Sequence, residues 1–373
     1  MQHVDPLKEA RSPGLLLAPF TDHWAVYDLL THSVHLLQPF AGLILDTPVA
    51  QRSSLVTDVA EAGGQSVETV EAHLADMAGD LVGVGLLGRT EPWEPPEALT
   101  GSSAVDAEGQ SVGPAMALLD HRIAFRSSDG DLLGHVEALL GIEPCDGDPT
   151  GYFDVEPDGE GGILLEAAEE WHFPTVEGFD IQLPGAINDF VSRSSGLLVL
   201  HGGAVRTPAG EVIVVPGLPE AGKSTLTAAL VAAGCDYLGD EIIGVRPDSR
   251  DAVGVPRPAA LDMRSREVLG LSGLDPSWPY VAMSSIRADA TAVTGDAGPI
   301  DRVVMARFDP AATSIEQTTL APRDALEAML PAVFNIVRCG EGGWVSLCRL
   351  AGEVPVTSVT HPDAPRLAEA LLT

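Results

Sequence analysis

The amino-acid sequence predicts an α/β protein in which a small α+β unit precedes a larger domain. Three observations lead to this prediction. A glycine-rich run at residues 217–224 lies between a predicted strand and a predicted helix. Two short strands and then three helices are predicted within the first 98 residues. A proline-rich stretch separates the two parts, and a chain of 373 residues is long enough for two hydrophobic cores.

The N-terminal unit begins with two predicted strands. His23–Asp28 and Ser33–Leu37 form these strands, and residues 30–32 form the turn between them. Three helices are expected to follow, over residues 41–45, 53–62 and 66–81. The last helix has the clearest pattern, because Ser66 is a typical N-cap and apolar residues recur behind it at helical spacing. Two strands followed by three helices predict a winged-helix-like shape.

A linker is expected after this unit. Residues 91–96 contain three prolines, and residues 102–113 are rich in glycine and in small and polar side chains. The predicted boundaries are 1–98 for the N-terminal domain, 99–113 for the linker and 114–373 for the second domain, divided into 114–196 and 197–373. In the part before residue 197, the patterns predict strands at 116–125 and 162–165, and helices at 132–140 and 186–193.

From residue 197 onward, strands alternate with a helix. Residues 197–200 predict a buried strand that ends at His201, and residues 211–215 predict a second strand. The run G-L-P-E-A-G-K-S follows, and then an apolar helix over 224–233 that ends at Gly234, a typical left-handed cap. Strand, glycine loop and helix in this order are the context that a P-loop requires. A further strand is predicted at Ile242–Val245.

Lys223 stands out because the chain contains only two lysines against 19 arginines. In a P-loop, backbone N–H groups surround the phosphates, the lysine reaches the β- and γ-phosphates, and the hydroxyl group that follows binds Mg²⁺. The motif therefore predicts a site for a nucleoside triphosphate, ATP or GTP, with Mg²⁺. The expected nucleotide-binding residues are Gly217, Glu220, Ala221, Gly222, Lys223, Ser224 and Thr225.

Two adjacent acids, Asp240 and Glu241, lie at a predicted strand end 17 residues after Lys223. One carboxylate can bind Mg²⁺ with Ser224, while the other takes a proton from a substrate hydroxyl group. The alternative is a solvated acidic turn, which is common in a chain with 54 acidic residues. His201 is a further candidate, since it follows a strand and precedes two glycines, although a lone histidine is more often structural or exposed.

The runs around residues 200–205, 214–225 and 238–241 resemble the HPr kinase/phosphorylase superfamily. The resemblance covers residues 114–373 and implies a P-loop kinase domain with a mixed sheet, related to phosphoenolpyruvate carboxykinase. It implies that Asp240 is the general base, Glu241 a metal-linked acid and His201 the partner of Asp240. Lys223 would complete the catalytic set. Whether Asp240 or Glu241 is the base stays open.

The chain departs from the founding members of this superfamily, which carry Asp where Glu241 stands, and it lacks their downstream signature segment. It is more similar to divergent HPr-kinase-like enzymes of peptide natural-product pathways, some of which phosphorylate serine hydroxyl groups. Arg257, between two prolines, is a candidate phosphate or substrate contact. A surface arginine in a proline turn is the alternative.

Residues 20–88 resemble the PqqD-like family, on the apolar patterns at 24–28, 34–37 and 86–87. Such domains hold a leader peptide by adding it as a strand to a sheet edge. A winged-helix shape also suits DNA binding, but residues 1–97 carry 14 acidic and 4 basic side chains, a net charge of −10. That charge disfavours nucleic acid as a partner.

The whole chain has a formal net charge of −33, which disfavours nucleic acid and anionic membranes as partners. No apolar run is long enough to span a membrane and no secretory signal is visible, so a cytoplasmic location is expected. The four cysteines show no metal-binding spacing, which predicts free thiols. Homo-oligomer formation stays open.

The expected function is an ATP- and Mg²⁺-dependent kinase that transfers the γ-phosphate to a Ser or Thr hydroxyl group of a ribosomally synthesised peptide. The N-terminal unit would recognise that peptide. One alternative is a kinase of the same fold that acts on a small molecule such as an amino acid. Another is a non-catalytic protein in which bound nucleotide controls peptide binding.

Overall fold

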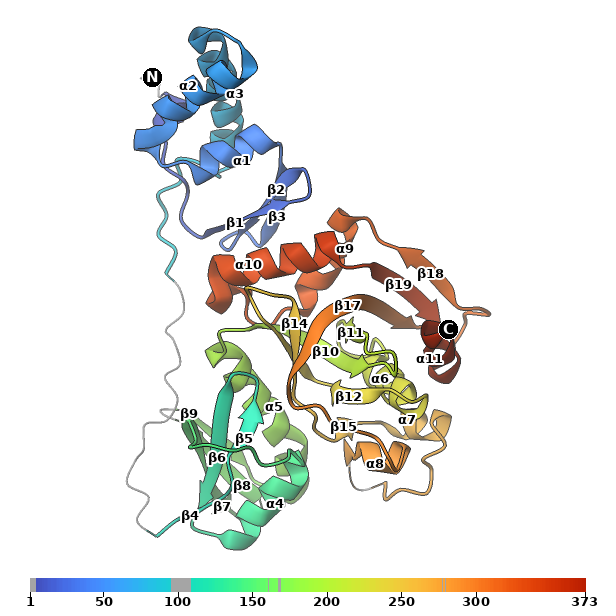
Figure 1. Ribbon diagram of the computed structural model, residues 1–373. Helices are drawn as coiled ribbons and strands as arrows, with labels where there is room; N and C mark the ends of the chain where they lie inside the picture. Colours follow the sequence, from blue (N-terminus) through green and yellow to red (C-terminus); the bar gives the residue numbers. More distant parts are fainter. Residues whose placement is uncertain (1–4, 95–108, 160, 167–168, 277, 279) are drawn as a thin grey trace.

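The computed structural model describes residues 5–94, 109–159, 161–166, 169–276, 278 and 280–373. It is a mixed α/β structure with separate sheets in its N-terminal, middle and C-terminal parts (Figure 1). Most of the predicted linker, 99–113, lies outside the described residues. Its last part is not linker, because β4 (Ser111–Val112) pairs with a strand of the middle sheet.

The N-terminal unit is an antiparallel sheet followed by three helices. The strands are β1 (Leu15–Phe20), β2 (His23–Asp28) and β3 (Ser33–Leu37), in that order in the sheet. The helices are α1 (Pro39–Asp46), α2 (Arg52–Gly63) and α3 (Val67–Gly83), with short 3₁₀ turns η1 (Pro6–Lys8) and η2 (Val49–Gln51). The predicted strands and helices are confirmed, and the Ser66 side chain caps α3 by accepting a hydrogen bond from Thr69 N–H. The expectation of only two strands is wrong, since β1 adds a third.

Strand β1 was missed because its apolar run carries no alternation, and the structure gives the reason. Leu15 and Leu17 pack against α1–α3, whereas Leu16, Ala18 and Phe20 pack against the C-terminal part of the chain. A strand that is buried on both faces shows no polar–apolar alternation. The N-terminal sheet therefore lies between its own helices and α10 (Ile336–Glu353), as Figure 1 shows.

The middle unit carries the six-stranded sheet and two helices. Its remaining strands are β5 (Met116–Leu118), β6 (His121–Ser127), β7 (Gly151–Asp158), β8 (Gly161–Glu166) and β9 (Glu169–Phe173), and its helices are α4 (Gly130–Leu140) and α5 (Val176–Ser194). The single strand predicted at 116–125 is two strands, because the chain turns at Leu119, which has a φ of 58°. Helix α5 is longer than the predicted 186–193, and it continues through Pro184.

The C-terminal part is built on an eight-stranded mixed sheet. Its strands are β10 (Leu198–Arg206), β11 (Val212–Pro216), β12 (Asp236–Gly239), β13 (Ile242–Val245), β14 (Asp251–Gly254), β17 (Gly295–Phe308), β18 (Glu316–Thr319) and β19 (Val356–His361). Strand β17 pairs with β14 at its start and runs parallel to β11 and β19 farther along, so the sheet curls back on itself. A two-stranded ribbon, β15 (Ala259–Ala260) and β16 (Tyr280–Val281), lies beside it.

Helices cover both faces of this curled sheet. They are α6 (Lys223–Ala232), α7 (Met263–Val268), α8 (Met283–Ile286), α9 (Pro322–Met329) with the 3₁₀ turn η3 (Leu330–Ala332), α10, and α11 (Ala364–Leu372). Helices α6 and α11 share one core with the sheet, and α9 and α10 share another. No helix in the described part of the chain has the length and apolar character needed to cross a membrane. The four cysteines are free thiols.

Strand β10 does not end at His201 as predicted but continues to Arg206. The pair Gly202-Gly203 suggested a strand end, whereas the structure uses both glycines inside the strand. A Cβ atom on Gly202 would lie 2.6 Å from the carbonyl oxygen of Val215, and one on Gly203 would lie 2.0 Å from Thr227 Oγ1. The glycines therefore allow β11 and α6 to approach β10 closely.

Candidate functional site

The predicted strand–loop–helix unit is present. Strand β11 leads into the loop 217–222, and α6 begins at Lys223. Gly222 stands at the helix N-cap with a φ of 88°, a left-handed conformation that suits glycine. The N–H group of Gly217 donates a 3.1 Å hydrogen bond to the His201 carbonyl group, which fixes the start of the loop to β10. The N-terminus of α6, the positive end of its dipole, therefore lies at this loop, which suits an anion.

Lys223 is 6% exposed, and its ammonium group donates a 2.8 Å hydrogen bond to the carbonyl oxygen of Leu218 in its own loop. Burial lowers the pKa of Lys223, and the charges of Asp240 and Glu241 oppose that shift. The lysine therefore lies within electrostatic reach of the acid pair, as its predicted role requires. The bond to Leu218 is one that a phosphate oxygen could replace.

The acid pair lies between β12 and β13, with Asp240 4% exposed. Neither carboxylate oxygen of Asp240 has a hydrogen-bond partner of normal geometry among the described residues. Burial raises the pKa of Asp240 to about 8, and the neighbouring Glu241 adds to the rise. The Ser224 hydroxyl group, Lys223 and Arg257 act in the opposite direction. The alternative of a solvated acidic turn is therefore wrong for Asp240.

His201 lies within β10, beside the loop 217–222, and its ring stacks on Phe334 at a centroid distance of 5.1 Å. Burial and the charge of Lys223 lower its pKa to about 4, so the ring is neutral at pH 7. In the described part of the chain, neither carboxylate oxygen of Asp240 is hydrogen-bonded to His201, so the side-chain pairing that the resemblance implied is not formed. The backbone instead connects the two regions, because Gly202 N–H donates a 3.2 Å hydrogen bond to the carbonyl oxygen of Glu241.

Arg257 is 7% exposed, so the alternative of a surface arginine is wrong. Its guanidinium group donates a 3.4 Å hydrogen bond to the carbonyl oxygen of Pro184 in α5, and its own carbonyl accepts one from Tyr237. The charge of Arg257 is among the causes that lower the pKa of Asp240. Arg257 is thus buried within electrostatic reach of the acid pair.

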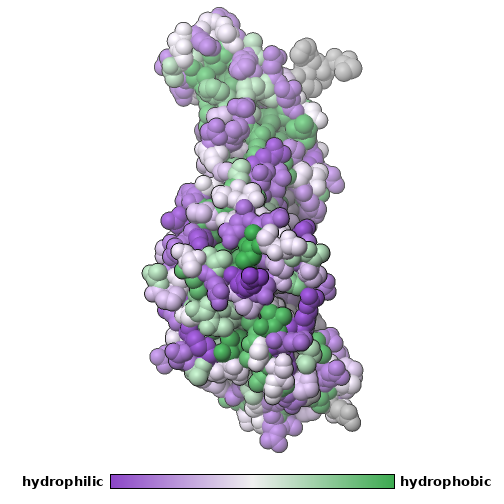
Figure 2. All heavy atoms as spheres, turned by 90° about the vertical axis from the view of Figure 1, so that its right-hand side faces the viewer, coloured by the Kyte–Doolittle hydropathy of each residue, from purple (hydrophilic) through white to green (hydrophobic). Residues whose placement is uncertain are grey.

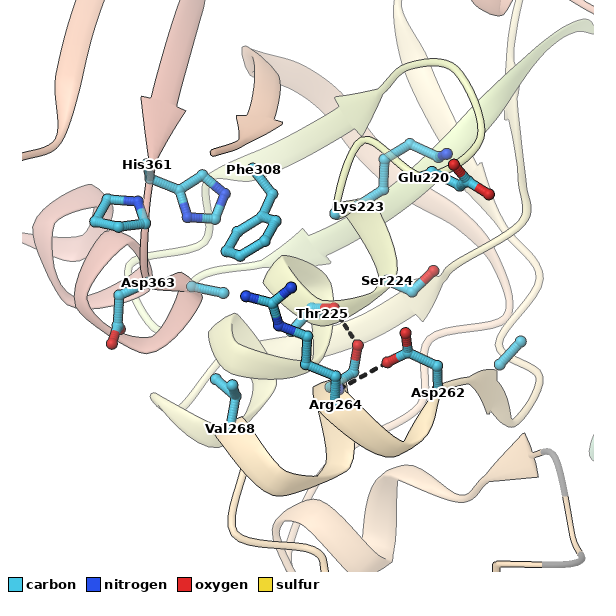
Figure 3. Close-up of a pocket in the computed structure, with 15 residues that line it drawn as sticks. Glu220, Lys223, Ser224, Thr225, Asp262, Arg264, Val268, Phe308, His361 and Asp363 are labelled. Carbon is cyan, nitrogen blue, oxygen red and sulfur yellow. Dashed lines mark hydrogen bonds between the residues drawn. The ribbon is translucent and has the colours of Figure 1, made fainter. Parts of the chain in front are cut away.

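A cavity of about 460 Å³ opens beside the loop 217–222 and the start of α6 (Figure 3). Five of the predicted nucleotide-binding residues line it: Glu220, Gly222, Lys223, Ser224 and Thr225. Of the catalytic candidates, Lys223 lines this cavity, whereas Asp240 and His201 do not. Neither the metal candidate Glu241 nor the substrate-contact candidate Arg257 lines it. Lys223 lines the cavity, and the charges of both acids act on its pKa.

The far wall of the cavity was not predicted. It includes Arg264 and Asp262 from the region of α7, Phe308 at the end of β17, and His361 at the end of β19. These residues follow no motif and come from elements that the sequence patterns did not resolve. Figure 2 shows the face of the molecule that carries α7 and α11. In the lower half of this view, apolar side chains gather and polar side chains surround them.

Two contacts connect the loop 217–222 and the start of α6 to this wall. The Thr225 hydroxyl group lies 2.7 Å from the hydroxyl group of Ser265 in α7. The N–H group of Phe308 donates a 3.2 Å hydrogen bond to the carbonyl oxygen of Ala221. The loop and the far wall are therefore parts of one connected site.

No protein-family model matches this chain, and no curated protein matches it significantly.

Proposed function

We propose that this protein is an ATP- and Mg²⁺-dependent kinase that transfers the γ-phosphate to a hydroxyl group of a peptide. Asp240 is the observation that carries the proposal. A carboxyl group that is buried, without a normal hydrogen-bond partner and raised in pKa to about 8 is suited to accept a proton near neutral pH. It lies within electrostatic reach of the P-loop lysine.

The residues around Asp240 fit Mg²⁺. The ion prefers hard oxygen ligands, and it is commonly held by one or two carboxylates and by the phosphates of the nucleotide. Ser224 and Glu241 would hold it, and the unpartnered oxygens of Asp240 show that this region has acceptor capacity to spare. No group of three or more His, Cys, Asp or Glu among the described residues suits a metal without the nucleotide. Bound Mg²⁺ would neutralise charge on the phosphates.

In the transfer step, one bond to the γ-phosphorus forms as another breaks. The acceptor oxygen forms a bond to the γ-phosphorus, and the bond between that phosphorus and the β–γ bridging oxygen breaks, with ADP as the leaving group. The proton of the acceptor hydroxyl group goes to Asp240. Lys223 and the N-terminus of α6 stabilise the negative charge on the phosphates.

Two features of the fold support the proposed families. A curled mixed sheet with a P-loop between β11 and α6 supports the HPr kinase and phosphoenolpyruvate carboxykinase type. A three-stranded sheet followed by three helices supports a PqqD-like unit over residues 20–88. In the described part of the chain, β3 is an edge strand of that sheet, and a leader peptide could pair with it.

Labelled phosphate tests the proposal. We expect γ-labelled ATP with Mg²⁺ to label a peptide encoded beside this gene, and Lys223→Ala or Asp240→Asn to abolish the labelling. Asp289→Asn serves as a matched control, since this carboxylate is 89% exposed. Undiminished labelling by Asp240→Asn would show that the base has been assigned wrongly.

Removal of the leader sequence from the peptide substrate distinguishes a peptide kinase from a small-molecule kinase. If the N-terminal unit recognises the peptide, removal of its leader lowers kcat/KM, while free serine is a poor acceptor. Equal turnover of free serine and the full peptide would favour the small-molecule kinase. Tight ATP binding without turnover of any acceptor would favour the non-catalytic protein.

A further inference from the structure

The far wall of the cavity has a chemistry that the proposed phosphate loop, residues 217–222, lacks. Phe308 offers an aromatic surface, Arg264 a planar cation and His361 a buried imidazole, and all three line the same cavity as Thr225. We infer that this wall is a purine-binding subsite, in which the base stacks on Phe308 and Arg264 and its edge meets His361. The inference rests on the proposed function and assigns the nucleobase end of the same site.

A stacking surface is already formed. The Arg264 guanidinium carbon lies 4.6 Å from the centroid of the Phe308 ring, as in a cation–π contact. Figure 3 shows the two side chains meeting within the cavity. Arginine and aromatic planes are the surfaces on which nucleobases stack in proteins, and stacking favours the larger purine ring.

The position of this surface is fixed relative to the phosphate loop. Phe308 N–H is hydrogen-bonded to Ala221, and Thr225 is hydrogen-bonded to Ser265 in the same helix as Arg264. These two bonds set the spacing between a phosphate at the loop and a base on the wall. The cavity of about 460 Å³ lies within the range of small-ligand sites.

The buried imidazole of His361 supports the subsite independently of the stacking surface. It is 1% exposed, and neither ring nitrogen has a hydrogen-bond partner of normal geometry among the described residues. Its ring meets Phe308 at a tilt of 66° with 5.8 Å between centroids. Burial is the main cause that lowers the pKa of His361, which favours the neutral ring. A neutral imidazole offers one donor and one acceptor, and a purine edge presents both.

The two carboxylates of the wall are already used within the protein. Asp262 caps α7 by accepting a 2.7 Å hydrogen bond from Ser265 N–H, and Asp363 caps α11 through Arg366 N–H at 2.8 Å. Arg264 and His361 are therefore the polar side chains of the wall that remain for a ligand. The arginine can stack on the face of a nucleobase, and the neutral imidazole can form hydrogen bonds with its edge.

Calorimetric titration of the full chain with ADP, UDP and inorganic tripolyphosphate, each with Mg²⁺, tests the subsite. We expect the wild-type protein to bind ADP more tightly than UDP or tripolyphosphate. Phe308→Ala, Arg264→Ala and His361→Phe should each weaken ADP about tenfold and leave tripolyphosphate within about twofold. Arg323→Ala is the matched control, because Arg323 is exposed, lies outside this cavity and forms an ion pair with Glu327 within α9.

The outcomes separate the subsite from the phosphate site. If the wild-type protein binds ADP, UDP and tripolyphosphate equally, the purine subsite is wrong and the P-loop assignment stands. Equal loss of ADP and tripolyphosphate in the three wall variants would also overturn the subsite, because it would indicate a general structural defect. If the wild-type protein binds none of the three ligands, the proposed function fails and the subsite fails with it.

Discussion

The Tyr237 hydroxyl group donates a 2.7 Å hydrogen bond to the backbone carbonyl of Arg257 in the interior of the protein. Tyr237 belongs to β12, which leads directly to Asp240, and Arg257 follows β14. The bond therefore joins the strand that carries the acid to the segment that carries the nearby cation. It explains how a residue between two prolines comes to influence the pKa of Asp240.

Removing the charge of Arg257 should shift the pH dependence of phosphate transfer. The guanidinium group stabilises the ionised form of Asp240, so Arg257→Gln raises the pKa of Asp240 further. At pH 7 a smaller fraction of Asp240 is then ionised. If the pKa of Asp240 rises by about one unit, its ionised fraction at pH 7 falls about tenfold. We therefore expect about a tenfold lower rate at pH 7 and recovery of the rate at higher pH. The pH–rate profile of label transfer measures this effect, and an unshifted profile would contradict it.

Asp240 should destabilise the folded protein at high pH. Its folded pKa of about 8 lies above the ordinary value of 3.8, so between these values the folded state binds more protons than the unfolded state. The contribution of Asp240 to the free energy of unfolding therefore falls as the pH rises through that window, and it is unaffected below it. Asp240→Asn removes this loss, and the variant should be more stable than the wild type at pH 9 by about 2 kcal/mol or more.

Urea unfolding at pH 5 and pH 9 checks this expectation. At pH 5 the fall in stability that begins near pH 3.8 is only partly complete, so the stability advantage of Asp240→Asn over the wild type should be smaller than at pH 9. Asp289→Asn supplies the control on the exposed surface. A stability difference between wild type and Asp240→Asn that is the same at both pH values would show that Asp240 titrates normally.

Trp344 should hold the N-terminal unit in place. It is fully buried in α10, stacks on Tyr27 at 5.3 Å, and its indole N–H donates a 3.0 Å hydrogen bond to the carbonyl of Ala25. Trp344→Ala should cost about 3–5 kcal/mol of unfolding free energy. Trp344→Phe retains an aromatic ring and should cost less. Hydrogen exchange should rise in β1 and β2 of the alanine variant, and unchanged protection there would contradict a docking role.

Local patterns predicted those elements whose residues are determined by near neighbours in sequence. The cap at Ser66 and the run up to Lys223 are such cases, because helix caps and the P-loop depend on a few consecutive residues. Arg257 could not be resolved in this way, since its burial depends on α5 and on Tyr237. Phe308 and His361 meet only because β17 and β19 run parallel, with these two residues paired in register.

The glycines of β10 also depend on contacts with residues that are distant in sequence. Gly203→Ala would place its Cβ atom 2.0 Å from Thr227 Oγ1 in α6, a side chain that is 1% exposed. The strand or the helix must then shift, at a cost of about 1–3 kcal/mol of stability. Since α6 begins at the phosphate loop, ADP and tripolyphosphate should both bind more weakly.

A second substitution tests that reason. Thr227→Ala removes the atom that Gly203→Ala would meet, so the double variant should regain most of the lost stability and affinity. Gly134→Ala is the matched control, because Gly134 lies within α4 with no atom within 4 Å of an added Cβ. It should gain about 0.5–1 kcal/mol from helix propensity. If the double variant is no better than Gly203→Ala alone, the close approach of α6 to β10 does not explain the glycine.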